Sequence, residues 1–423
     1  MKRYLLVWLT GMTALLLVVA AFNAVVDPYG LFRWIDHPGF NHIKPAAADR
    51  GPMTKAYQVL RVQPRTLVLG NSRAELGLDP NDPAWPPQAQ PVYNLALPGT
   101  GTATSLHYLQ HVLAATADNP TAQPTLVVWG IDLMDFLTAP HAVLGTQSLI
   151  GGDLRLLLPG NTVRWQQQVR DHVESTLTMN ALLDSLTTLV NQRNPYAIDL
   201  TPQGFNPMRE YTKISQEEGY WAIFRQRDQD NIRAFLRRPN NIYGVDRRTS
   251  PRLDDLKEVI HLCRQNGIAL RLFTYPYHAH LLEIFRITGH WSAFEEWKRA
   301  IVQILAEESA TSGKPAFELW DFSELNAYTT ETVPAQGDRR SSTRWYWESG
   351  HFKSMLGSLM LNRMVNHSAQ PSNLGVLLTS TNVQEQLHIN LTDMETYFDS
   401  HIEEVAVLQD FFRTVLARQA TGH

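Results

Sequence analysis

Cysteine is almost absent from this chain, which has a single one, Cys263, among its 423 residues and can therefore form no intramolecular disulfide. Cys263 falls within an apolar helical pattern, where a cysteine is normally a core residue. The chain also lacks an excess of cations, because 37 Lys and Arg face 41 Asp and Glu and leave a net charge of -4. Such a chain cannot neutralise many phosphates, so we expect no nucleic-acid partner.

Motifs for metals and nucleotides are missing as well. There is no His-Glu-x-x-His, no cysteine pair, and no carboxylate cluster at ligand spacing. The stretch Gly99-Thr100-Gly101-Thr102 lacks the Gly-Lys-Ser/Thr ending of a phosphate-binding loop. We therefore expect no metal and no cofactor. Hydrophobic residues nevertheless make up 44% of the chain, which excludes a disordered protein and is enough for one elaborated domain or two.

The N-terminus differs from the rest of the chain. After Met1-Lys2-Arg3, residues 4–26 contain no ionisable side chain except Tyr4. Because about 20 apolar residues can cross a bilayer, we expect residues 1–28 to be an uncleaved membrane anchor, with cleavage after Val19-Ala20-Ala21 as the alternative. The positive-inside tendency would keep Lys2 and Arg3 in the cytoplasm. This predicts a single-pass protein of the bacterial inner membrane whose folded body lies in the periplasm.

From about residue 55 to residue 370, apolar runs rich in strand-forming residues alternate with helical patterns. Strands are expected over residues 66–69, 91–96, 125–129, 268–274 and 317–321, and connecting helices over 104–115, 253–265, 294–308 and 352–365. This alternation predicts an α/β fold with a central parallel sheet. Ligands of such sheets bind at the carboxyl ends of the strands. Ser72, Gly99, Asp132 and residues 275–278 each follow a predicted strand, so we expect them along one rim.

Two regions interrupt or follow this alternation. Residues 139–243 read as a helical insertion with helices over 163–190 and 220–236, which either caps the substrate site or is only a structural addition. Residues 371–423 form a predicted C-terminal helical extension with one long helix over about 382–419. Its apolar positions are three or four residues apart, which favours docking on the body over contact with another subunit. These positions are Leu391, Met394, Phe398, Ile402, Val405, Leu408, Phe412 and Val415.

A serine and a distant acid-x-x-His pair supply the parts of a nucleophilic site. Ser72 follows a predicted strand in Gly70-Asn71-Ser72-Arg73, and the pair stands in Glu348-Ser349-Gly350-His351. A serine hydroxyl needs an imidazole to take its proton and a carboxylate to orient that imidazole. We therefore predict Ser72 as the nucleophile, His351 as the base and Glu348 as the orienting acid.

Four short blocks, in order, resemble the SGNH/GDSL hydrolase superfamily over about residues 60–365: Gly70-Asn71-Ser72, Asn94-Leu95-Ala96-Leu97-Pro98-Gly99, Gly130-Ile131-Asp132 and Glu348-Ser349-Gly350-His351. The anchor, the Asp27-Pro28-Tyr29-Gly30 stretch and the Gly-Asn-Ser-Arg variant are similar to the membrane-anchored bacterial envelope branch related to polysaccharide O-acetyltransferases. The resemblance implies a flavodoxin-like three-layer α/β/α fold and an acyl-Ser72 intermediate. It also implies a polysaccharide or other glycan substrate and a multi-spanning membrane protein that delivers acyl groups.

The resemblance assigns the oxyanion hole to the backbone N–H groups of Ser72 and Gly99 and to the third block. There, Asp132 replaces the asparagine that usually donates its amide. An ionised carboxylate would repel the developing negative charge, so Asp132 has to be protonated, turned away or replaced by another donor. The chain also departs from the usual pattern at Asn71, which replaces Asp, and at Glu348, which is one methylene longer than Asp.

Three further residues are candidates for substrate binding. Arg73 would steady an anionic group on the substrate or form a salt bridge. Asn94 lies in the second block, and His278 follows a predicted strand as either a substrate contact or a structural histidine. The expected function is serine-dependent acyl transfer on an envelope or exported polysaccharide, as an esterase if water accepts the acyl group and as an O-acyltransferase if a sugar hydroxyl does. The alternative is a non-catalytic envelope assembly or glycan-binding protein with the same fold.

Overall fold

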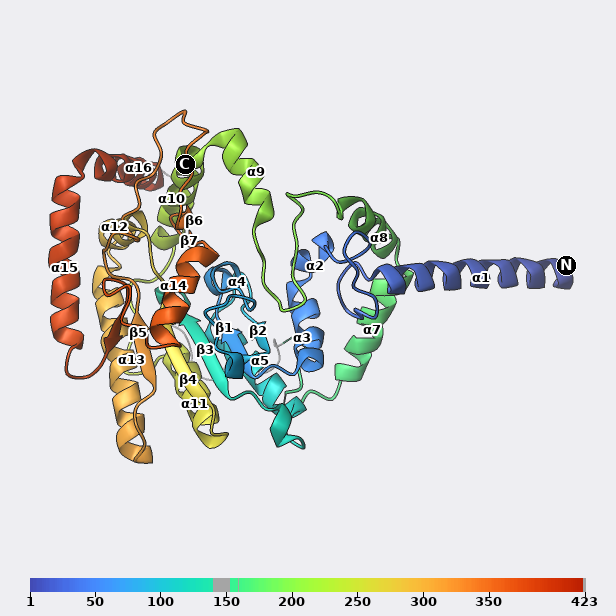
Figure 1. Ribbon diagram of the computed structural model, residues 1–423. Helices are drawn as coiled ribbons and strands as arrows, with labels where there is room; N and C mark the ends of the chain where they lie inside the picture. The colour runs from blue at the N-terminus through green and yellow to red at the C-terminus, as the bar shows by residue number, and fades with distance from the viewer. Residues whose placement is uncertain (140–152, 159, 421–423) are drawn as a thin grey trace. The chain divides into compact units, whose positions relative to one another are not determined.

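The computed structural model describes residues 1–139, 153–158 and 160–420 (Figure 1). Over these residues the chain is a mixed α/β protein with a mostly parallel sheet and one N-terminal apolar helix. It forms two compact units, each assembled from separate stretches of sequence. Unit 1 comprises Met1–Gln63, Gln110–Gln123 and Gly152–Lys213, and unit 2 comprises Pro64–Leu109, Pro124–Gly151 and Ile214–His423. Residues 140–152 and 159 of the predicted insertion, and residues 421–423 of the predicted extension, lie outside the described residues.

The central sheet of unit 2 has the strand order β2-β1-β3-β4-β5-β8. The first five strands are parallel, and β8 pairs antiparallel with β5 at the edge. The strands are β1 (Thr66–Leu69), β2 (Val92–Asn94), β3 (Leu126–Ile131), β4 (Ala269–Thr274), β5 (Glu318–Asp321) and β8 (Val376–Leu378). Every residue of β1 and β2 is buried, as is typical of strands in parallel sheets.

The apolar runs of the sequence locate the five parallel strands to within a few residues. β1 has the predicted bounds, whereas β3 continues two residues further and brings Asp132 directly after its end. Three short strands were not predicted: β8 and the antiparallel hairpin of β6 (Tyr346–Glu348) and β7 (His351–Phe352). Strands of two or three residues are too short to show a periodic pattern.

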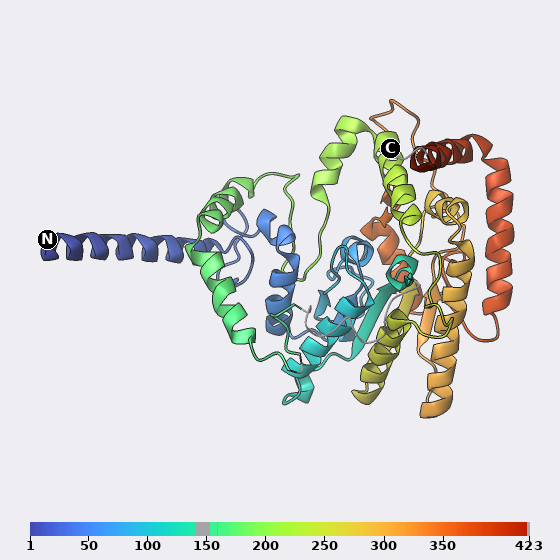
Figure 2. The same ribbon diagram turned by 180° about the vertical axis from the view of Figure 1, so that it is seen from behind.

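The helices of unit 2 lie beside this sheet (Figures 1 and 2). Lys298 Nζ of α13 (Trp291–Ser312) donates to Asp321 Oδ2 at the end of β5 over 2.7 Å. The Arg363 guanidinium of α14 (Ser354–Met364) lies 5.4 Å from the Trp320 ring of β5. The unit contains α4 (Ser72–Gly77), η1 (Pro87–Ala89), α6 (Leu133–Phe136), α10 (Tyr220–Leu236), α11 (Pro251–Gln265), α12 (Ala279–Ile287), α13 (Trp291–Ser312) and α14 (Ser354–Met364). Helices α5 (Thr102–Ala115) and α9 (Arg209–Glu218) have residues in both units.

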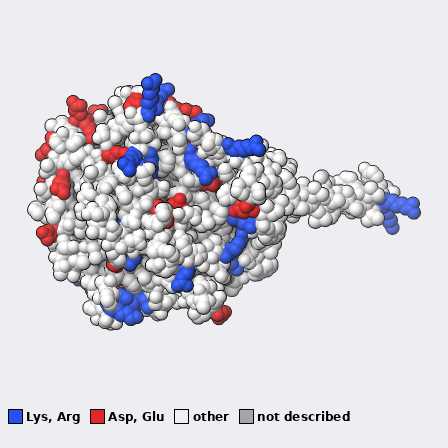
Figure 3. Space-filling model, viewed as in Figure 1, with Lys and Arg blue, Asp and Glu red and all other residues white. Residues whose placement is uncertain are grey.

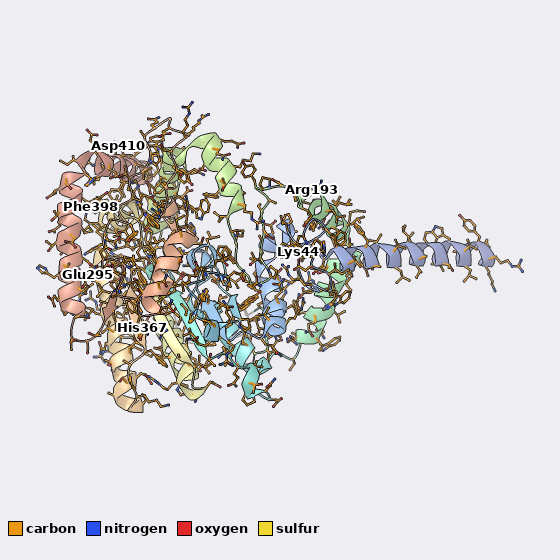
Figure 4. All side chains as sticks on the ribbon, viewed as in Figure 1. Lys44, Arg193, Glu295, His367, Phe398 and Asp410 are labelled. Carbon is orange, nitrogen blue, oxygen red and sulfur yellow. The ribbon has the colours of Figure 1, made fainter. Side chains whose placement is uncertain are left out.

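The C-terminal extension contains two helices, α15 (Val383–Ser400) and α16 (Ile402–Ala420), so the prediction of one long helix is wrong. The chain breaks at His401, whose ring stacks on Tyr397 at 3.9 Å and whose Nδ1 lies 2.8 Å from the Tyr397 carbonyl oxygen. Ile402 is consequently 70% exposed and does not belong to the buried stripe. Met394, Phe398 and Val405 pack with Ala279 of α12, which agrees with the predicted docking on the body. Phe398 is labelled in Figure 4.

Unit 1 is helical, with α1 (Lys2–Val26), α2 (Pro45–Asp49), α3 (Gly51–Val62), η2 (Pro120–Ala122), α7 (Arg164–Leu177) and α8 (Met179–Asn191). The single helical stretch predicted over residues 163–190 is two helices, because Thr178 leaves the helical conformation and caps α8 by accepting a hydrogen bond from the Ala181 N–H. Among the described residues, α1 is the one helix that is long and apolar enough to cross a membrane. Positive charge marks its free tip, and the rest of its surface carries no charge (Figure 3).

A buried charge pair ends α1 and turns the chain. Lys44 Nζ donates to the carbonyl oxygens of Val26 and Asp27 over 3.1 and 2.8 Å, and Lys44 is labelled beside the end of α1 in Figure 4. The Asp27 carboxylate accepts hydrogen bonds from the backbone N–H groups of residues 31–33. Burial lowers the pKa of Lys44 to about 8 against the opposing effect of Asp27. These hydrogen bonds thus hold the Asp27-Pro28-Tyr29-Gly30 stretch in a defined turn directly after α1.

Candidate active site

Ser72 stands at a sharp turn between strand β1 and helix α4. The turn passes through Gly70, whose φ of +142° and close neighbours admit only glycine: a Cβ there would lie 2.5 Å from the Tyr275 hydroxyl oxygen. Asn71 then caps α4, its Oδ1 accepting a hydrogen bond from the Arg73 N–H over 3.1 Å. Ser72 is therefore the first residue of α4, in a turn that the surrounding side chains hold fixed.

The acid and the base come from the hairpin of β6 and β7. Glu348 and His351 face each other in the antiparallel pairing, with Ser349 and Gly350 as the turn between them. The Gly350 N–H donates to Glu348 Oε2, which fixes the carboxylate within its own turn. Two strands of two and three residues thus place an acid and an imidazole side by side.

The three predicted catalytic residues meet at this point of unit 2. Ser72 Oγ lies 2.8 Å from His351 Nε2. His351 Nδ1 forms a hydrogen bond with Glu348 Oε1. With Nδ1–H donating to the carboxylate, Nε2 is left to accept the hydrogen of the Ser72 hydroxyl. This is the arrangement that a serine nucleophile needs.

Glu348 is held in its charged form. Burial alone would raise its pKa, but His351, Arg227 and the Gly350 N–H outweigh this effect and lower the pKa to about 2. Arg227 Nε of α10 lies 3.0 Å from Glu348 Oε1. The carboxylate can therefore stabilise an imidazolium when His351 takes a proton from Ser72.

The structure does not support Asp132 as an oxyanion donor, because its carboxylate is occupied as an acceptor. Asp132 Oδ2 forms a buried ion pair with Arg73 and accepts from Asn71 Nδ2 over 3.0 Å. Asp132 Oδ1 accepts from the Tyr277 hydroxyl over 2.9 Å and from the Met134 N–H over 3.1 Å. These four partners keep the Asp132 carboxylate within a network of donors rather than free to donate to an oxyanion.

Arg73 forms a salt bridge within the protein, which was one of the two roles expected for it. Its guanidinium is buried against Asp132 and lies 5.8 and 5.5 Å from the ring centroids of Tyr275 and Tyr277. Asp135 adds a second carboxylate that accepts from Asn71 Nδ2 over 3.1 Å. Burial, with the neighbouring Asp132, raises the pKa of Asp135 well above its usual value. This network fastens the residues on either side of Ser72 to the ends of β3 and β4.

Two backbone N–H groups remain as candidate oxyanion donors. The Ser72 N–H belongs to the first turn of α4, where backbone donors lack an intrahelical partner. Gly99 lies on an exposed loop with a φ of +68°, and this loop is tied to the Ser72 turn by a 3.0 Å bond from the Leu97 N–H to the Gly70 carbonyl. The loop that carries Gly99 is therefore anchored two residues before Ser72.

Asn94 and His278 lie in the interior of unit 2, so their predicted contact with substrate gains no support. The Asn94 amide donates to the carbonyl oxygens of Ala74 and Leu78, both over 2.9 Å, and holds α4 against β2. His278 is fully buried, with Nε2 2.9 Å from the Glu331 carbonyl oxygen. Burial and the neighbouring His280 lower the pKa of His278 to about 3, as expected for a structural histidine.

His280 is bound by two carboxylates, with Nδ1 2.8 Å from Asp228 Oδ2 and Nε2 2.8 Å from Glu404 Oε1. Burial opposes the charge, but the two acids raise the pKa of His280 to about 10. Within residues 1–139, 153–158 and 160–420, no three His, Cys, Asp or Glu side chains are placed to hold a metal ion. Cys263 is buried, and burial raises the pKa of its thiol to about 12.

Sequence reasoning missed several residues that shape the site. Tyr275 and Tyr277 belong to the stretch expected at the rim, and their placement after β4 was the available signal. Asn71 was noted only as a departure from the family pattern, although an Asn before a short helix is a capping signal. Arg227 lies on α10, and nothing in its local sequence marks it as a partner of a residue 121 positions away.

Two segments of unit 2 that are far apart in sequence, the β1–α4 turn and the β6–β7 hairpin, thus bring a serine, a histidine and a glutamate into contact. In comparisons with known proteins, no protein-family model and no curated protein matched the chain.

Proposed function

We propose that the protein is a membrane-anchored serine acyl-transfer enzyme of the SGNH type that acts on O-acyl groups of an envelope or exported polysaccharide. The observation that carries this proposal is the 2.8 Å contact between Ser72 Oγ and His351 Nε2, with Glu348 on the other imidazole nitrogen. The flavodoxin-like three-layer fold is part of the same proposal. The strand order β2-β1-β3-β4-β5 supports it, because this is the order of flavodoxin-like sheets.

In the first half of the reaction, His351 Nε2 takes the hydroxyl proton while Ser72 Oγ attacks the acyl carbonyl carbon. The carbonyl oxygen becomes an oxyanion, for which the Ser72 and Gly99 N–H groups are the candidate donors. The ester bond of the donor then breaks, and the proton on His351 passes to the leaving oxygen. Acyl-Ser72 remains, and the ionised Glu348 offsets the charge of the imidazolium throughout.

In the second half, His351 takes a proton from the acceptor hydroxyl, whose oxygen attacks the acyl carbon. The bond to Ser72 Oγ breaks, and the proton returns to Ser72. Water as the acceptor makes the enzyme an esterase, and a sugar hydroxyl makes it an O-acyltransferase. We favour the transferase, on the basis of the resemblance to envelope O-acetyltransferases.

The proposed location is the bacterial inner membrane, with α1 as a single span and the catalytic unit in the periplasm. The length and composition of α1, with Lys2 and Arg3 at its free end, support this orientation. Acyl donors made in the cytoplasm would then have to cross the membrane, so we propose a multi-spanning membrane protein as the partner that delivers the acyl group.

Labelling with a serine-directed fluorophosphonate tests the proposed chemistry. The probe should form a covalent bond with Ser72 Oγ and lose fluoride, and labelling should disappear in Ser72→Ala and in His351→Gln. Ser349→Ala is the matched control, because Ser349 is also a buried serine next to the site and its Oγ has no partner among the described residues. Unchanged labelling, ester turnover and glycan acylation in Ser72→Ala would end the proposal.

One observation favours a second candidate, a non-catalytic envelope assembly or glycan-binding protein. In the SGNH pattern the third block supplies an amide that donates to the oxyanion. In this chain the same position is Asp132, whose carboxylate accepts hydrogen bonds from Asn71 and Tyr277. If this is the function, correctly folded wild-type protein should leave the fluorophosphonate unreacted, and glycan binding should be unchanged in Ser72→Ala.

A further inference from the structure

Helix α7 of unit 1 has its apolar side turned outward. Its fully buried residues are Asp171 and Ser175, which are polar. Its exposed large apolar side chains recur every four residues and are 43 to 62% exposed: Trp165, Val169, Val173 and Leu177. Four-residue spacing places them along one face of the helix. A helix that packs on a protein core normally buries its apolar side and exposes its polar side to water, whereas α7 does the opposite.

Helix α8 repeats the inversion. Its buried residues are Ala181, Ser185 and Thr188, which are small or polar. Its large apolar side chains are spaced by three or four residues and are 47 to 78% exposed: Met179, Leu183, Leu186 and Val190. We call these four side chains, together with the four exposed apolar side chains of α7, the apolar face of unit 1. An exposed set of large apolar side chains of this kind marks an interaction surface.

The polar inner sides of both helices hold the end of α1. Asn23 Nδ2 donates to the Thr176 carbonyl oxygen of α7 over 2.8 Å, and the Ser185 hydroxyl of α8 donates to Asn23 Oδ1 over 2.9 Å. Figure 1 shows α7 crossing the axis of α1 at this end rather than continuing it. Both helices are therefore fixed to the same short segment of the apolar helix.

The length of α1 places that segment at the membrane surface. The side chains of residues 2–18 are all exposed, and burial against the rest of unit 1 begins at residue 19. At 1.5 Å per residue the exposed stretch is about 25 Å long, close to the roughly 30 Å of a hydrocarbon core. If Lys2 and Arg3 lie at one surface, the other surface falls where α7 and α8 pack on α1.

Trp34 adds an anchor of the kind found at membrane surfaces. It is 73% exposed and lies 4.8 Å, ring to ring, from Phe32, which in turn contacts His172 of α7. Exposed tryptophan side chains are enriched where lipid headgroups meet water. Trp34 is thus linked through Phe32 to α7, one of the two helices that form the apolar face.

We infer that the apolar face of unit 1 lies in the lipid interface, so that α7 and α8 rest in the leaflet from which α1 emerges. The occupant of this face is lipid, and the inference depends on the proposed membrane span of α1. Amphipathic helices bind membranes in this way, with their apolar side among the acyl chains near the headgroups. Contacts of α1, α7 and α8 with the bilayer would together fix the tilt and rotation of unit 1. A single span by α1 would leave unit 1 free to rotate about the helix axis.

The test uses full-length protein in phosphatidylcholine and phosphatidylglycerol vesicles, with an environment-sensitive fluorophore on single introduced cysteines. Cys263 is buried and does not compete for the label. We expect labels at Val173→Cys and Leu183→Cys to emit at shorter wavelength and to be quenched several-fold more by spin-labelled lipid than a label at Val245→Cys. Val245 is the matched control, an apolar residue of unit 2 that is 69% exposed.

Flotation with the vesicles and quenching by spin-labelled lipid distinguish the possible negative results. If the protein does not float with the vesicles, the span of α1 fails, and this inference fails with it. If the protein floats but all three labels behave alike, the apolar face is not in lipid and only this inference is overturned. Blue-shifted labels that lipid does not quench would also overturn it, in favour of a second copy or a membrane protein on this face. None of these outcomes depends on Ser72, so the acyl-transfer proposal is tested separately.

Discussion

Unit 2 contains two histidines beside buried carboxylates, and they have opposite capacities for proton transfer. His351 contacts one acid, Glu348, and places its other nitrogen on the Ser72 hydroxyl. His280 contacts an acid with each nitrogen, Asp228 and Glu404, and its pKa is raised to about 10. An imidazole between two carboxylates keeps its proton, whereas one between a carboxylate and a hydroxyl can exchange it. The second neighbour of each ring therefore separates a candidate base from a structural cation.

Helix α10 contributes a charged side chain to each of these sites from adjacent positions. Arg227 contacts Glu348, and Asp228 contacts His280. Adjacent helix residues point about 100° apart, so one helix can serve two clusters. The comparison of the two histidines can therefore be tested by substitutions that are close in the structure.

The largest effect is expected from His351→Gln. The variant keeps a polar side chain but cannot accept the Ser72 proton, so kcat/KM for a small ester should fall by about 10⁴-fold. Initial-rate kinetics with an activated acetyl ester would measure it. Circular dichroism should show the same fold as the wild type, and a loss of less than tenfold would contradict the role of His351.

Glu348→Gln should have the next largest effect, about 10³-fold in kcat/KM, because a neutral amide cannot stabilise the imidazolium.

The same variant tests the low pKa of Glu348. A pKa lowered from 4.5 to about 2 stabilises the fold above pH 4.5, and this contribution is lost as the pH falls towards 2. The difference in unfolding free energy between wild type and variant should therefore be constant above pH 5 and shrink below it. A difference that does not change with pH would contradict the assignment.

His280→Gln should reduce stability rather than catalysis. It leaves Asp228 and Glu404 without their cation, and we expect a loss of about 3 kcal/mol in the free energy of unfolding by urea denaturation. The His280 contribution is complete below pH 6.5 and is lost as the pH rises through about 10, because the folded state holds the proton longer than the unfolded state does.

His388→Gln, at an exposed histidine of α15, is the matched control and should change stability by less than about 0.5 kcal/mol. The activity of folded His280→Gln should equal that of the wild type. A loss of activity comparable to that of His351→Gln would remove the distinction between the two sites.

Arg227→Gln should have the smallest effect, about a tenfold loss in kcat/KM. The guanidinium is partly exposed, so water replaces part of its interaction with Glu348. Arg225→Gln is the control on the same helix, because the Arg225 guanidinium lies over Trp221 at 5.4 Å instead. Equal effects of the two substitutions would show that the contact with Glu348 has no special role.

The sequence predicted those parts of the molecule in which local pattern and final environment agree. β1 and α10 have their predicted bounds, because an apolar run between turn residues and a continuous helical pattern leave few alternatives. The breaks at Thr178 and His401 were missed, because a helical pattern continues across both and only local hydrogen bonds interrupt it.

Ser72, His351 and Glu348 were predicted from residue types and their order, and the structure brings them together. The partners of Asp132 could not be predicted, because the ion pair with Arg73 joins residues 59 positions apart. The outward apolar sides of α7 and α8 were also missed. The helical pattern shows which residues share a face, but it does not show which face the rest of the chain will cover.

The ion pair of Arg73 with Asp132 has one more consequence. It ties the first turn of α4 to the residue that follows β3, and the Ser72 hydroxyl in this turn already contacts the His351 imidazole. If the proposed acyl transfer is correct, small activated esters should then acylate Ser72 before any sugar arrives. The balance between transfer and hydrolysis would then depend on how quickly the acceptor hydroxyl replaces water at acyl-Ser72.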